Sequence, residues 1–245
     1  MSRVADEPAA VETGELGGPT VVTVDGPAGS GKSTLGRRLA VALGLPFVDT
    51  GLFYRGVTVA AVRAGLDGAD TEAAAGLASR VRIELNTDPT GGSGAWVVRV
   101  DGEDAGEAAR DPQNAALLAA LSGMEGVRRA LLEPQRRAAA RGAVAVGRDC
   151  GTVVFPRAGV KLYLDAAPEV RASRREVQLR TRGTAVDAAQ LRSEVADRDA
   201  RDSQRVVAPL RRAADAHVID TGAHGIDEVV ELALEICRRA GVPGS

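Results

Sequence analysis

The stretch that decides the fold is Val21-Val-Thr-Val-Asp25, followed by Gly26-Pro-Ala-Gly-Ser-Gly-Lys-Ser33. The first five residues are mostly β-branched and apolar, which predicts a short buried strand. The next eight match the pattern G-x-x-x-x-G-K-[ST], which belongs between a strand and a helix. Apolar residues then recur at helical spacing from Ser33 to Leu43, and Gly44 is placed to end that helix. The order strand, glycine-rich loop, helix therefore predicts a phosphate-binding loop.

The chemistry of the loop explains its pattern. Glycines allow successive backbone N–H groups to point into one concavity at a helix N-terminus, where a polyphosphate is stabilised. Lys32 is expected to reach the β- and γ-phosphates, and the Ser33 hydroxyl to ligate Mg²⁺. An Asn-Lys-x-Asp guanine reader is absent from the sequence, which argues against a GTPase. The residues expected to bind ATP are Gly26, Pro27, Ala28, Gly29, Ser30, Gly31, Lys32, Ser33 and Thr34.

The composition narrows the class of protein. The 33 acidic side chains nearly match the 31 basic ones, of which only two are lysines, so a polycation that coats nucleic acid is not indicated. Aromatic residues make up 2%, which argues against a base-stacking platform. Cys150 and Cys237 are too few for a disulfide framework or a structural zinc site. His217 and His224 leave little material for a histidine-based catalytic triad.

The N-terminal segment 1–19 is polar and acidic. It lacks a basic start followed by an apolar stretch, so it is predicted to be a flexible tail rather than a signal peptide. No apolar run approaches the roughly 20 residues that a membrane-spanning helix needs. We therefore expect a cytoplasmic protein whose partners include neither membranes nor nucleic acid.

Beyond the loop, apolar strands alternate with amphipathic helices, which implies a parallel sheet. Two extended runs, Val81–Leu85 and Ala95–Val100, flank the turn-rich segment Asn86–Gly94 and imply a small antiparallel insertion. We thus predict an α/β fold: a P-loop three-layer fold with a central parallel sheet, a small β-containing insertion and a helical, arginine-rich lid. Further strands are expected at Pro46–Val48, Ala143–Val146, Val160–Leu164 and His217–Asp220, and further helices at Gly51–Ala64, Thr71–Ser79, Gln113–Leu121, Gly126–Arg141, Pro168–Arg180, from Asp187 onward and at Ile226–Ala240.

Two charged segments follow predicted strands, at the edge of the sheet where ligands of such folds bind. One runs from Asp49 to Arg55, and Arg55 is either a ligand for an anion or an ordinary surface arginine. The other places Arg148 and Asp149 directly after a buried strand, where they either bind a substrate or form a local ion pair. Both segments are candidates for the acceptor side of a phosphoryl transfer.

A third segment gathers charge on one face of a predicted helix. Its members at positions i, i+3, i+4 and i+7 are Arg198, Arg201, Asp202 and Arg205. They give that face three guanidinium groups and one carboxylate, whereas a merely solvated helix would scatter its charges. A dense arginine set lies upstream, around a glycine-containing break, and consists of Arg171, Arg174, Arg175, Arg180 and Arg182. This pattern favours a hinged lid that closes cations over phosphates.

With these motifs in this order, the sequence resembles the bacterial cytidylate kinases, the long form of the nucleoside monophosphate kinase family. The resemblance covers about Val21 to the C-terminus. It is carried by the phosphate loop, Asp49-Thr-Gly with Tyr54-Arg55, Val100-Asp-Gly-Glu-Asp104 with Arg110, Val127-Arg128, Gly147-Arg-Asp-Cys-Gly-Thr-Val-Val-Phe-Pro156, and Arg198–Arg205 followed by Ala208-Pro-Leu210.

The resemblance implies phosphorylation of CMP and dCMP to CDP and dCDP, with ATP as the phosphoryl donor and Mg²⁺ on Ser33. In that family Arg55, Arg148 and Arg205 would clamp the acceptor phosphate. Arg128 and Asp149 would read the base, and Arg198 with Asp202 would hold the sugar. The residues implied for catalysis are Lys32, Arg148, Arg175 and Arg205. Those implied for substrate binding are Asp49, Thr50, Tyr54, Arg55, Arg128, Arg148, Asp149, Arg198, Asp202 and Arg205.

The resemblance also implies a division of the chain and a monomeric state. After the tail 1–19, the P-loop kinase domain spans 20–245, with a core at 20–50 and 143–245. The region that binds the nucleoside monophosphate (NMP) is expected at about 51–125 and the lid at about 171–205.

The sequence departs from the family pattern at three places, and the first two bear on the strictness of base choice and on the coordination of Mg²⁺ and its water. Ala119 stands where a serine commonly contacts the base, Val146 stands where an acidic residue is common, and Leu52-Phe53 is bulkier than usual. A kinase for UMP or another small anionic acceptor therefore stays an alternative. A third alternative is an ATP-responsive regulatory module without turnover. It is less favoured, because every charged residue implied for the site is present.

Overall fold

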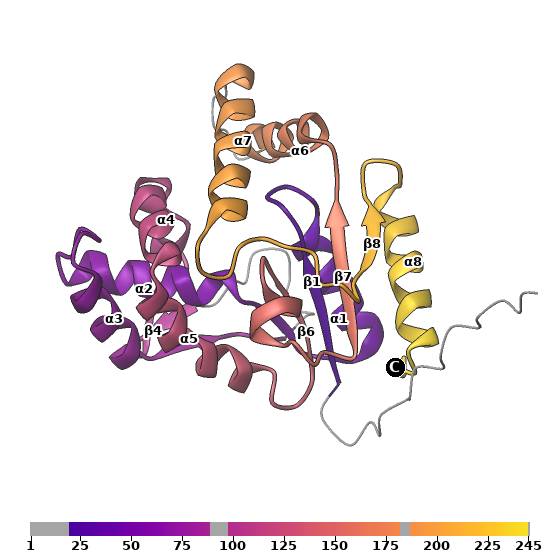
Figure 1. The fold of residues 1–245 in the computed structure, drawn as a ribbon, viewed down its shortest axis with the longest axis horizontal. Helices are drawn as coiled ribbons and strands as arrows, with labels where there is room; N and C mark the ends of the chain where they lie inside the picture. The colour runs from indigo at the N-terminus through magenta and orange to yellow at the C-terminus, as the bar shows by residue number, and fades with distance from the viewer. Residues whose placement is uncertain (1–19, 89–97, 182–186, 245) are drawn as a thin grey trace, which may run out of the picture.

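The computed structural model describes residues 20–88, 98–181 and 187–244. Its central sheet consists of five parallel strands in the order β2, β6, β1, β7, β8 (Figure 1). Their bounds are Val21–Asp25 (β1), Phe47–Asp49 (β2), Ala143–Gly147 (β6), Val160–Asp165 (β7) and His217–Asp220 (β8). Because the strands are parallel, the loops after β1, β2 and β6 emerge at one edge of the sheet, where such folds bind ligands. The predicted central parallel sheet is confirmed.

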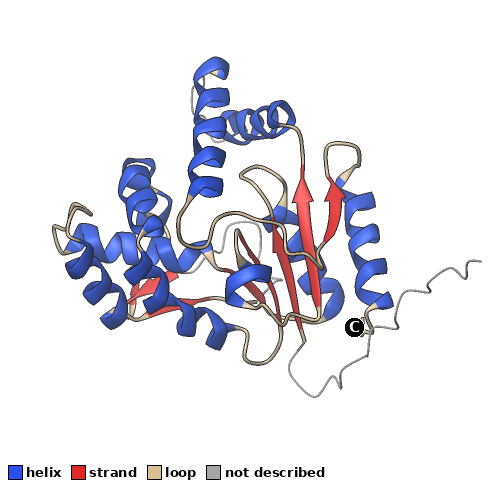
Figure 2. Ribbon diagram, viewed as in Figure 1, coloured by secondary structure: helices blue, strands red, loops and turns tan. Residues whose placement is uncertain are grey.

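Helices cover both faces of this sheet and make the fold three-layered (Figure 2). On one face α1 (Lys32–Leu43) packs on alternate residues of β6, Val144 and Val146, and α8 (Ile226–Arg239) packs beside α1 over β7 and β8. On the other face Ala145 packs with apolar residues of the helices that follow β2. The alternation along β6 follows from the period of two in a strand, which sends neighbouring side chains to opposite faces.

The insertion between β2 and β6 combines helices with a second sheet. Its three strands are antiparallel in the order β3, β4, β5. Its helices are α2 (Gly51–Arg63), α3 (Thr71–Arg80), α4 (Ala115–Gly123) and α5 (Glu125–Ala138), its strands are β3 (Ile83–Leu85), β4 (Val98–Val100) and β5 (Glu103–Asp104), and two 3₁₀ turns cover Ala108–Arg110 and Pro112–Asn114. The predicted antiparallel insertion is confirmed.

Strand β5 is missing from the sequence prediction, although the signal for it is present. Asp101 and Gly102 connect β4 to β5 with positive φ angles of 53° and 83°. Asp-Gly with both residues in that region is the favoured two-residue hairpin turn. The predicted connector Asn86–Gly94 and the predicted strand from Ala95 fall partly at 89–97, outside the described residues.

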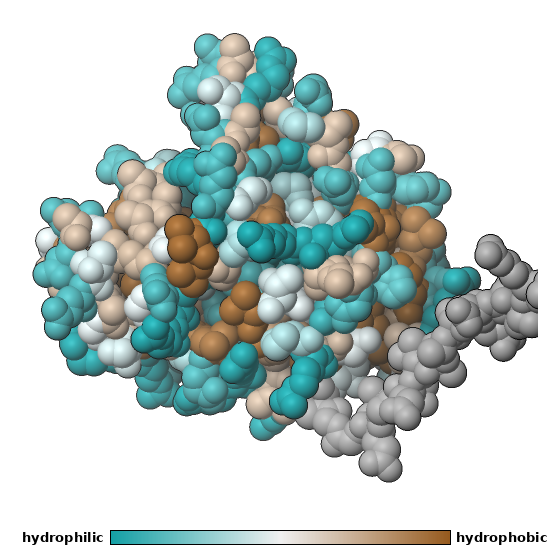
Figure 3. Space-filling view, viewed as in Figure 1, coloured by the Kyte–Doolittle hydropathy of each residue, from teal (hydrophilic) through white to brown (hydrophobic). Residues whose placement is uncertain are grey.

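The lid is the pair of helices α6 (Pro168–Thr181) and α7 (Ala188–Gln204), which rise from the ligand-binding edge of the sheet (Figure 1). Hydrophilic residues predominate over it at the top of the space-filling view (Figure 3). Arg171 of α6 joins the two helices to the rest of the domain. Its Nη1 lies 2.5 Å from Asp199 Oδ2 and also donates to the Ala28 carbonyl at 3.1 Å. Arg182 and the predicted break after Thr181 lie outside the described residues.

One detail of the predicted lid is wrong. Arg205 does not continue the helix, because α7 ends at Gln204 and Arg205 has an extended backbone (φ −55°, ψ 135°). The chain then turns back, and the Leu210 N–H donates to the Asp202 carbonyl at 2.8 Å. Arg201 is exposed, and its Nε donates to the Asp197 carbonyl of its own helix at 3.2 Å.

Within the described ranges, no helix has the length and apolar character that crossing a membrane requires.

Candidate active site

The segment Gly26–Ser33, called the donor loop below, joins β1 to α1. Gly31 stands before α1 with φ 92°, a left-handed conformation that favours glycine. At Gly26 a Cβ would lie 2.2 Å from the Leu164 carbonyl oxygen, so a side chain cannot be accommodated there. The loop therefore needs glycine both for its conformation and for its close approach to β7.

Lys32 is the cation of the donor loop. Its side chain is 8% exposed, and its Nζ donates to the Pro27 carbonyl at 2.6 Å. Burial, with the charge of Arg148 acting in the same direction, holds the pKa of Lys32 well below its usual value. A compact ammonium group is thus fixed inside the loop.

Ser33 and Asp49 face each other across the start of the site. Ser33 Oγ donates to Asp49 Oδ2 at 3.4 Å, and the other carboxylate oxygen of Asp49 accepts the Gly51 N–H at 3.0 Å. Burial raises the pKa of Asp49, while that hydrogen bond and the charge of Lys32 oppose the rise. The pair offers hard oxygen atoms on the donor side of the cleft.

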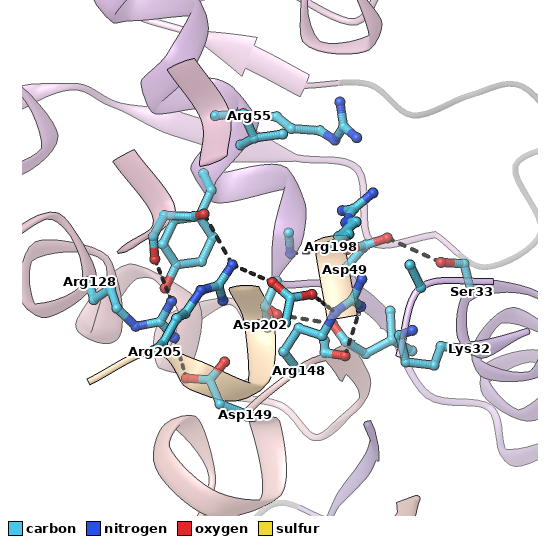
Figure 4. A pocket seen from close by; sticks show the side chains of 18 of the residues that line it. Lys32, Ser33, Asp49, Arg55, Arg128, Arg148, Asp149, Arg198, Asp202 and Arg205 are labelled. Atoms are coloured by element: carbon cyan, nitrogen blue, oxygen red, sulfur yellow. Dashed lines mark hydrogen bonds and ion pairs between the residues drawn. The ribbon is translucent and has the colours of Figure 1, made fainter. Parts of the chain in front are cut away.

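The opposite side of the cleft is formed by Arg128, Arg148, Asp149, Asp202 and Arg205, which we call the acceptor wall (Figure 4). Its first part is the ion pair between Arg128 Nη2 and Asp149 Oδ2, 2.5 Å apart. Both residues are buried, at 7% and 4% exposure, although they belong to α5 and to the turn after β6. Each of these desolvated charges requires the other as a partner, because a buried charge without a partner would strongly destabilise the folded protein.

Tyr54 and Ser122 complete the surroundings of this pair. The guanidinium of Arg128 stacks over the Tyr54 ring at 5.2 Å, and its Nη1 donates to the Ser122 carbonyl at 2.9 Å. Burial raises the pKa of Tyr54 to about 12, so its hydroxyl stays protonated. An aromatic face, a fixed guanidinium and a carboxylate therefore lie together, which suits a flat heterocycle with a polar edge.

The second part of the acceptor wall is Asp202 between two arginines. Asp202 Oδ2 accepts from Arg148 Nε at 2.8 Å, and Oδ1 accepts from Arg205 Nη2 at 2.5 Å. Although burial acts in the opposite direction, these two cations hold the pKa of Asp202 below its usual value. One buried carboxylate thereby orients two guanidinium groups in one cleft, and such groups match the geometry of a phosphate.

The cleft has a volume of about 250 Å³ and continues into a second one of about 770 Å³ between the insertion and the lid. Arg55 lines both, and its Nη1 donates to the Ala109 carbonyl at 2.6 Å. Arg175 and Arg198 of the lid line the second cleft, and Arg198 also lines the first. The second cleft is thus rich in arginine, since Arg110, Arg171, Arg201 and Arg205 line it as well.

Most of the residues that the sequence singled out meet in this cleft. The members that line the first part are Ala28, Gly29, Lys32, Ser33, Asp49, Thr50, Tyr54, Arg55, Arg128, Arg148, Asp149, Arg198, Asp202 and Arg205. Gly26, Pro27, Ser30 and Gly31 complete the donor loop behind them, whereas the Thr34 residue is exposed on α1 and lines neither part.

The three departures from the family pattern occupy definite places. The Val146 side chain is 1% exposed and packs in the core against Gly36 and Phe47. Ala119 lines the second cleft, and its carbonyl accepts from Ser122 Oγ at 3.2 Å. Leu52 and Phe53 are buried in two apolar clusters of the insertion.

Three buried polar residues of the site escaped the sequence analysis. Ser122 Oγ accepts from Arg205 Nη2 at 3.3 Å, and Gln135 Nε2 donates to the Thr50 carbonyl at 3.4 Å. Asp25 accepts two backbone N–H groups of the turn after β6. Only Asp25 carries a sequence signal, a carboxylate that ends an apolar strand directly before the donor loop.

Comparison with known proteins adds an independent finding. Residues 22–239 match the family model described as "Cytidylate kinase". The chain is 46% identical over 219 residues to a "Cytidylate kinase" of Nitratidesulfovibrio vulgaris strain Hildenborough, with 89% of this chain and 92% of the relative covered. Proteins of the same name from Pelotomaculum thermopropionicum and Rhodococcus opacus are 41% and 42% identical, over 86% and 91% of this chain and 92% and 96% of theirs.

Proposed function

The chain belongs to the cytidylate kinase family, and we propose on this premise that it transfers the γ-phosphoryl group of ATP to CMP and to dCMP. The products are ADP and CDP or dCDP. We assign the steps of this reaction to individual residues of the chain. We further propose that the enzyme is a monomer and that it acts in the cytoplasm. Elution as a single chain in size-exclusion chromatography would support the first of these two points.

On the donor side, the backbone N–H groups of the donor loop bind the ATP phosphates at the N-terminus of α1. Lys32 places one positive charge beside them, and its burial strengthens that interaction. This recognition uses groups that any nucleoside triphosphate would satisfy. The donor loop therefore supplies binding and charge rather than a choice among acceptors.

The oxygen atoms of Ser33 and Asp49 fit Mg²⁺, which prefers hard oxygen ligands. These two residues would hold it, and Ser33 is the ligand that the sequence predicts. When bound, the ion neutralises charge on the phosphate oxygens. Val146, which points into the core, contributes no carboxylate to this site.

On the acceptor side, Asp149 and Arg128 select the base. The exocyclic amino group of cytosine donates to a carboxylate, and its N3 and O2 atoms accept from a guanidinium. Uracil presents an acceptor and an N–H donor in the corresponding places, which would leave both buried charges mismatched at about 1 to 3 kcal/mol. Tyr54 contributes its face to the base.

Arg148 and Arg205, together with Arg55, bind the acceptor phosphate. Asp202 orients the first two, and with Arg198 it holds the sugar. The acceptor is a phosphate that is already ionised near neutral pH, so no general base is required. Catalysis then consists of positioning the two phosphates and stabilising the charge of the transferred group by Lys32 and by the arginines, Arg175 of the lid included.

The observation that carries this proposal is the buried Arg128–Asp149 pair, which lines the same cleft as Lys32. We would test it by coupled detection of ADP release with CMP, dCMP, UMP, AMP and GMP as acceptors. The two cytidine nucleotides should give the highest kcat/KM. A higher value with another nucleotide would contradict the base assignment, and ATP binding without turnover on any acceptor would favour a regulatory module.

A further inference from the structure

Asp25 lies between the two halves of the site, and the steps above give it no role. It is the last residue of the central strand β1, directly before Gly26 of the donor loop, and it is 5% exposed. Its Oδ1 accepts the Cys150 N–H at 2.9 Å, and its Oδ2 accepts the Gly151 N–H at 2.7 Å. One carboxylate thus uses both oxygens on two consecutive amides from a distant part of the chain.

Those two amides begin the turn that carries the acceptor wall. Cys150–Val154 form one turn of π-helix directly after Asp149. Within it the Val153 and Val154 N–H groups donate to the Asp149 carbonyl, at 2.9 and 3.1 Å. The first amides of a helical turn have no partner inside it. Asp25 supplies that partner, so it fixes the backbone immediately beside Asp149.

The chemistry of this contact requires a carboxylate. Two converging N–H groups need two acceptors, whereas asparagine offers one acceptor and would turn an NH₂ group toward the second donor. Burial raises the pKa of Asp25 to about 6, even though the two hydrogen bonds act in the opposite direction. An apolar side chain would fill the same space without the free-energy cost of burying a charge. The contact therefore serves to align two segments of the chain rather than to fill the core.

We propose that Asp25 is a positioning residue for the phosphoryl transfer, which holds Arg148 and Asp149 at a fixed place relative to the donor loop. The residue following Asp25 begins the donor loop, and the carboxylate of Asp25 binds the turn that follows Asp149. Any shift of this turn would move the acceptor away from the γ-phosphate without changing the donor loop. The inference rests on the proposed function, because that function assigns the acceptor to Arg148 and Asp149.

The test compares Asp25→Asn with the matched control Asp165→Asn in the full chain. Asp165 is the last residue of the neighbouring strand β7, but it is exposed and accepts the N–H of its own neighbour Ala166 at 2.9 Å. Asp25→Asn should raise the KM for CMP about 10-fold or more, as expected for loss of charge-assisted hydrogen bonds. The dissociation constant of ATP should stay within about 3-fold, and Asp165→Asn should leave both values within about 2-fold.

Gly151→Ala disturbs the same contact from the other side, since a Cβ there would lie 3.3 Å from Asp25 Oδ2 and 3.0 Å from Thr23 Oγ1. It should show the same selective rise in the KM for CMP. If one of the two variants does not fold, the other still tests the positioning role of Asp25. A lower melting temperature with unchanged KM values would overturn the proposal and leave Asp25 purely structural. Rapid hydrogen exchange of the Cys150 and Gly151 amides in the wild-type protein would overturn it as well. Absence of CMP turnover in the wild-type protein would instead refute the proposed function.

Discussion

The donor loop and the acceptor wall bind phosphates in two different ways. The donor loop is eight consecutive residues, which use backbone N–H groups at the start of α1 and a single lysine. The acceptor wall takes its residues from α5, the turn after β6 and the end of α7, and it pairs arginines with buried carboxylates. Backbone amides recognise any polyphosphate, whereas paired side chains also fix orientation and charge pattern. Damage to the loop should therefore affect every acceptor, and damage to the wall should change the preference among acceptors.

The largest effect is expected from Lys32→Arg, which keeps the charge but replaces a compact ammonium by a planar fork. The Nζ of Lys32 is buried 2.6 Å from the Pro27 carbonyl, where the wider group does not fit. We expect kcat to fall about 100- to 1,000-fold with CMP and with UMP alike, as for the loss of one preorganised charge. Steady-state kinetics with both acceptors measures this.

Lys161→Arg is the matched control for that experiment. Lys161 is equally buried, and its Nζ donates to the Pro156 carbonyl at 2.7 Å and pairs with the exposed Asp215, away from the cleft. Its activity should stay within about 2-fold of wild type, because any misfit of the wider guanidinium group at this position lies outside the cleft. Comparable losses in both lysine variants would remove the distinction between them.

The next largest effect is expected from Asp202→Asn, on the acceptor side. Without its negative charge, the guanidinium groups of Arg148 and Arg205 repel each other and lose their common anchor. Breaking such a partly buried network should lower kcat/KM for CMP about 100-fold, while equilibrium binding of ATP stays unchanged. If ATP affinity fell to the same extent, the acceptor wall would not be separable from the donor loop.

A pH experiment examines Asp25, which links the two regions. Its pKa is raised from 3.8 to about 6 in the folded protein, so its contribution to stability is present at low pH and is lost as pH rises through 6. Between pH 4.5 and 7 the free energy of unfolding of the wild type should fall by about 2 kcal/mol relative to Asp25→Asn. Urea unfolding of both proteins across this range measures the difference. A constant difference would show that Asp25 keeps an ordinary pKa.

The smallest effect is expected from Ser122→Ala. This change removes one neutral acceptor, 3.3 Å from Arg205 Nη2, while the Ser122 carbonyl that binds Arg128 is kept. The KM for CMP should rise about 2- to 10-fold with little change in kcat, the range for one ordinary hydrogen bond. Initial rates at varied CMP concentration suffice. A loss as large as that of Asp202→Asn would mean that the hydroxyl itself contacts the substrate.

The donor loop could be predicted from sequence almost completely, because each of its determinants is local. The strand Val21–Asp25 has the expected bounds, and α1 begins one residue before the expected Ser33. The parallel sheet could be predicted from the alternation of strands and helices, because the hydrophobic periodicity that marks each element is a property of a short window of sequence. The Asp101-Gly102 hairpin was equally readable and shows that the signal for β5 was overlooked.

The acceptor wall could not be assembled in the same way, because its contacts join residues that are far apart in the chain. The sequence marks Arg128 only through the family resemblance and Asp149 only as a charge directly after a buried strand, and it contains nothing that pairs the two residues. Asp25 meets Cys150 across 125 residues, a distance that no periodic pattern spans. Helical spacing also misplaced Arg205, whereas Pro209, which disfavours helix at the residue before it, marks where the helix cannot continue.

The measurement that tests the central claim most directly is the acceptor preference of Asp149→Asn. At saturating ATP, the ratio of kcat/KM for CMP to that for UMP should fall about 10-fold or more, because the carboxylate that accepts from the cytosine amino group is gone. The dissociation constant of ATP should stay within about 2-fold of wild type. Equal losses with CMP and UMP, or a loss of ATP binding, would contradict the account and make Asp149 a structural residue of the turn after β6.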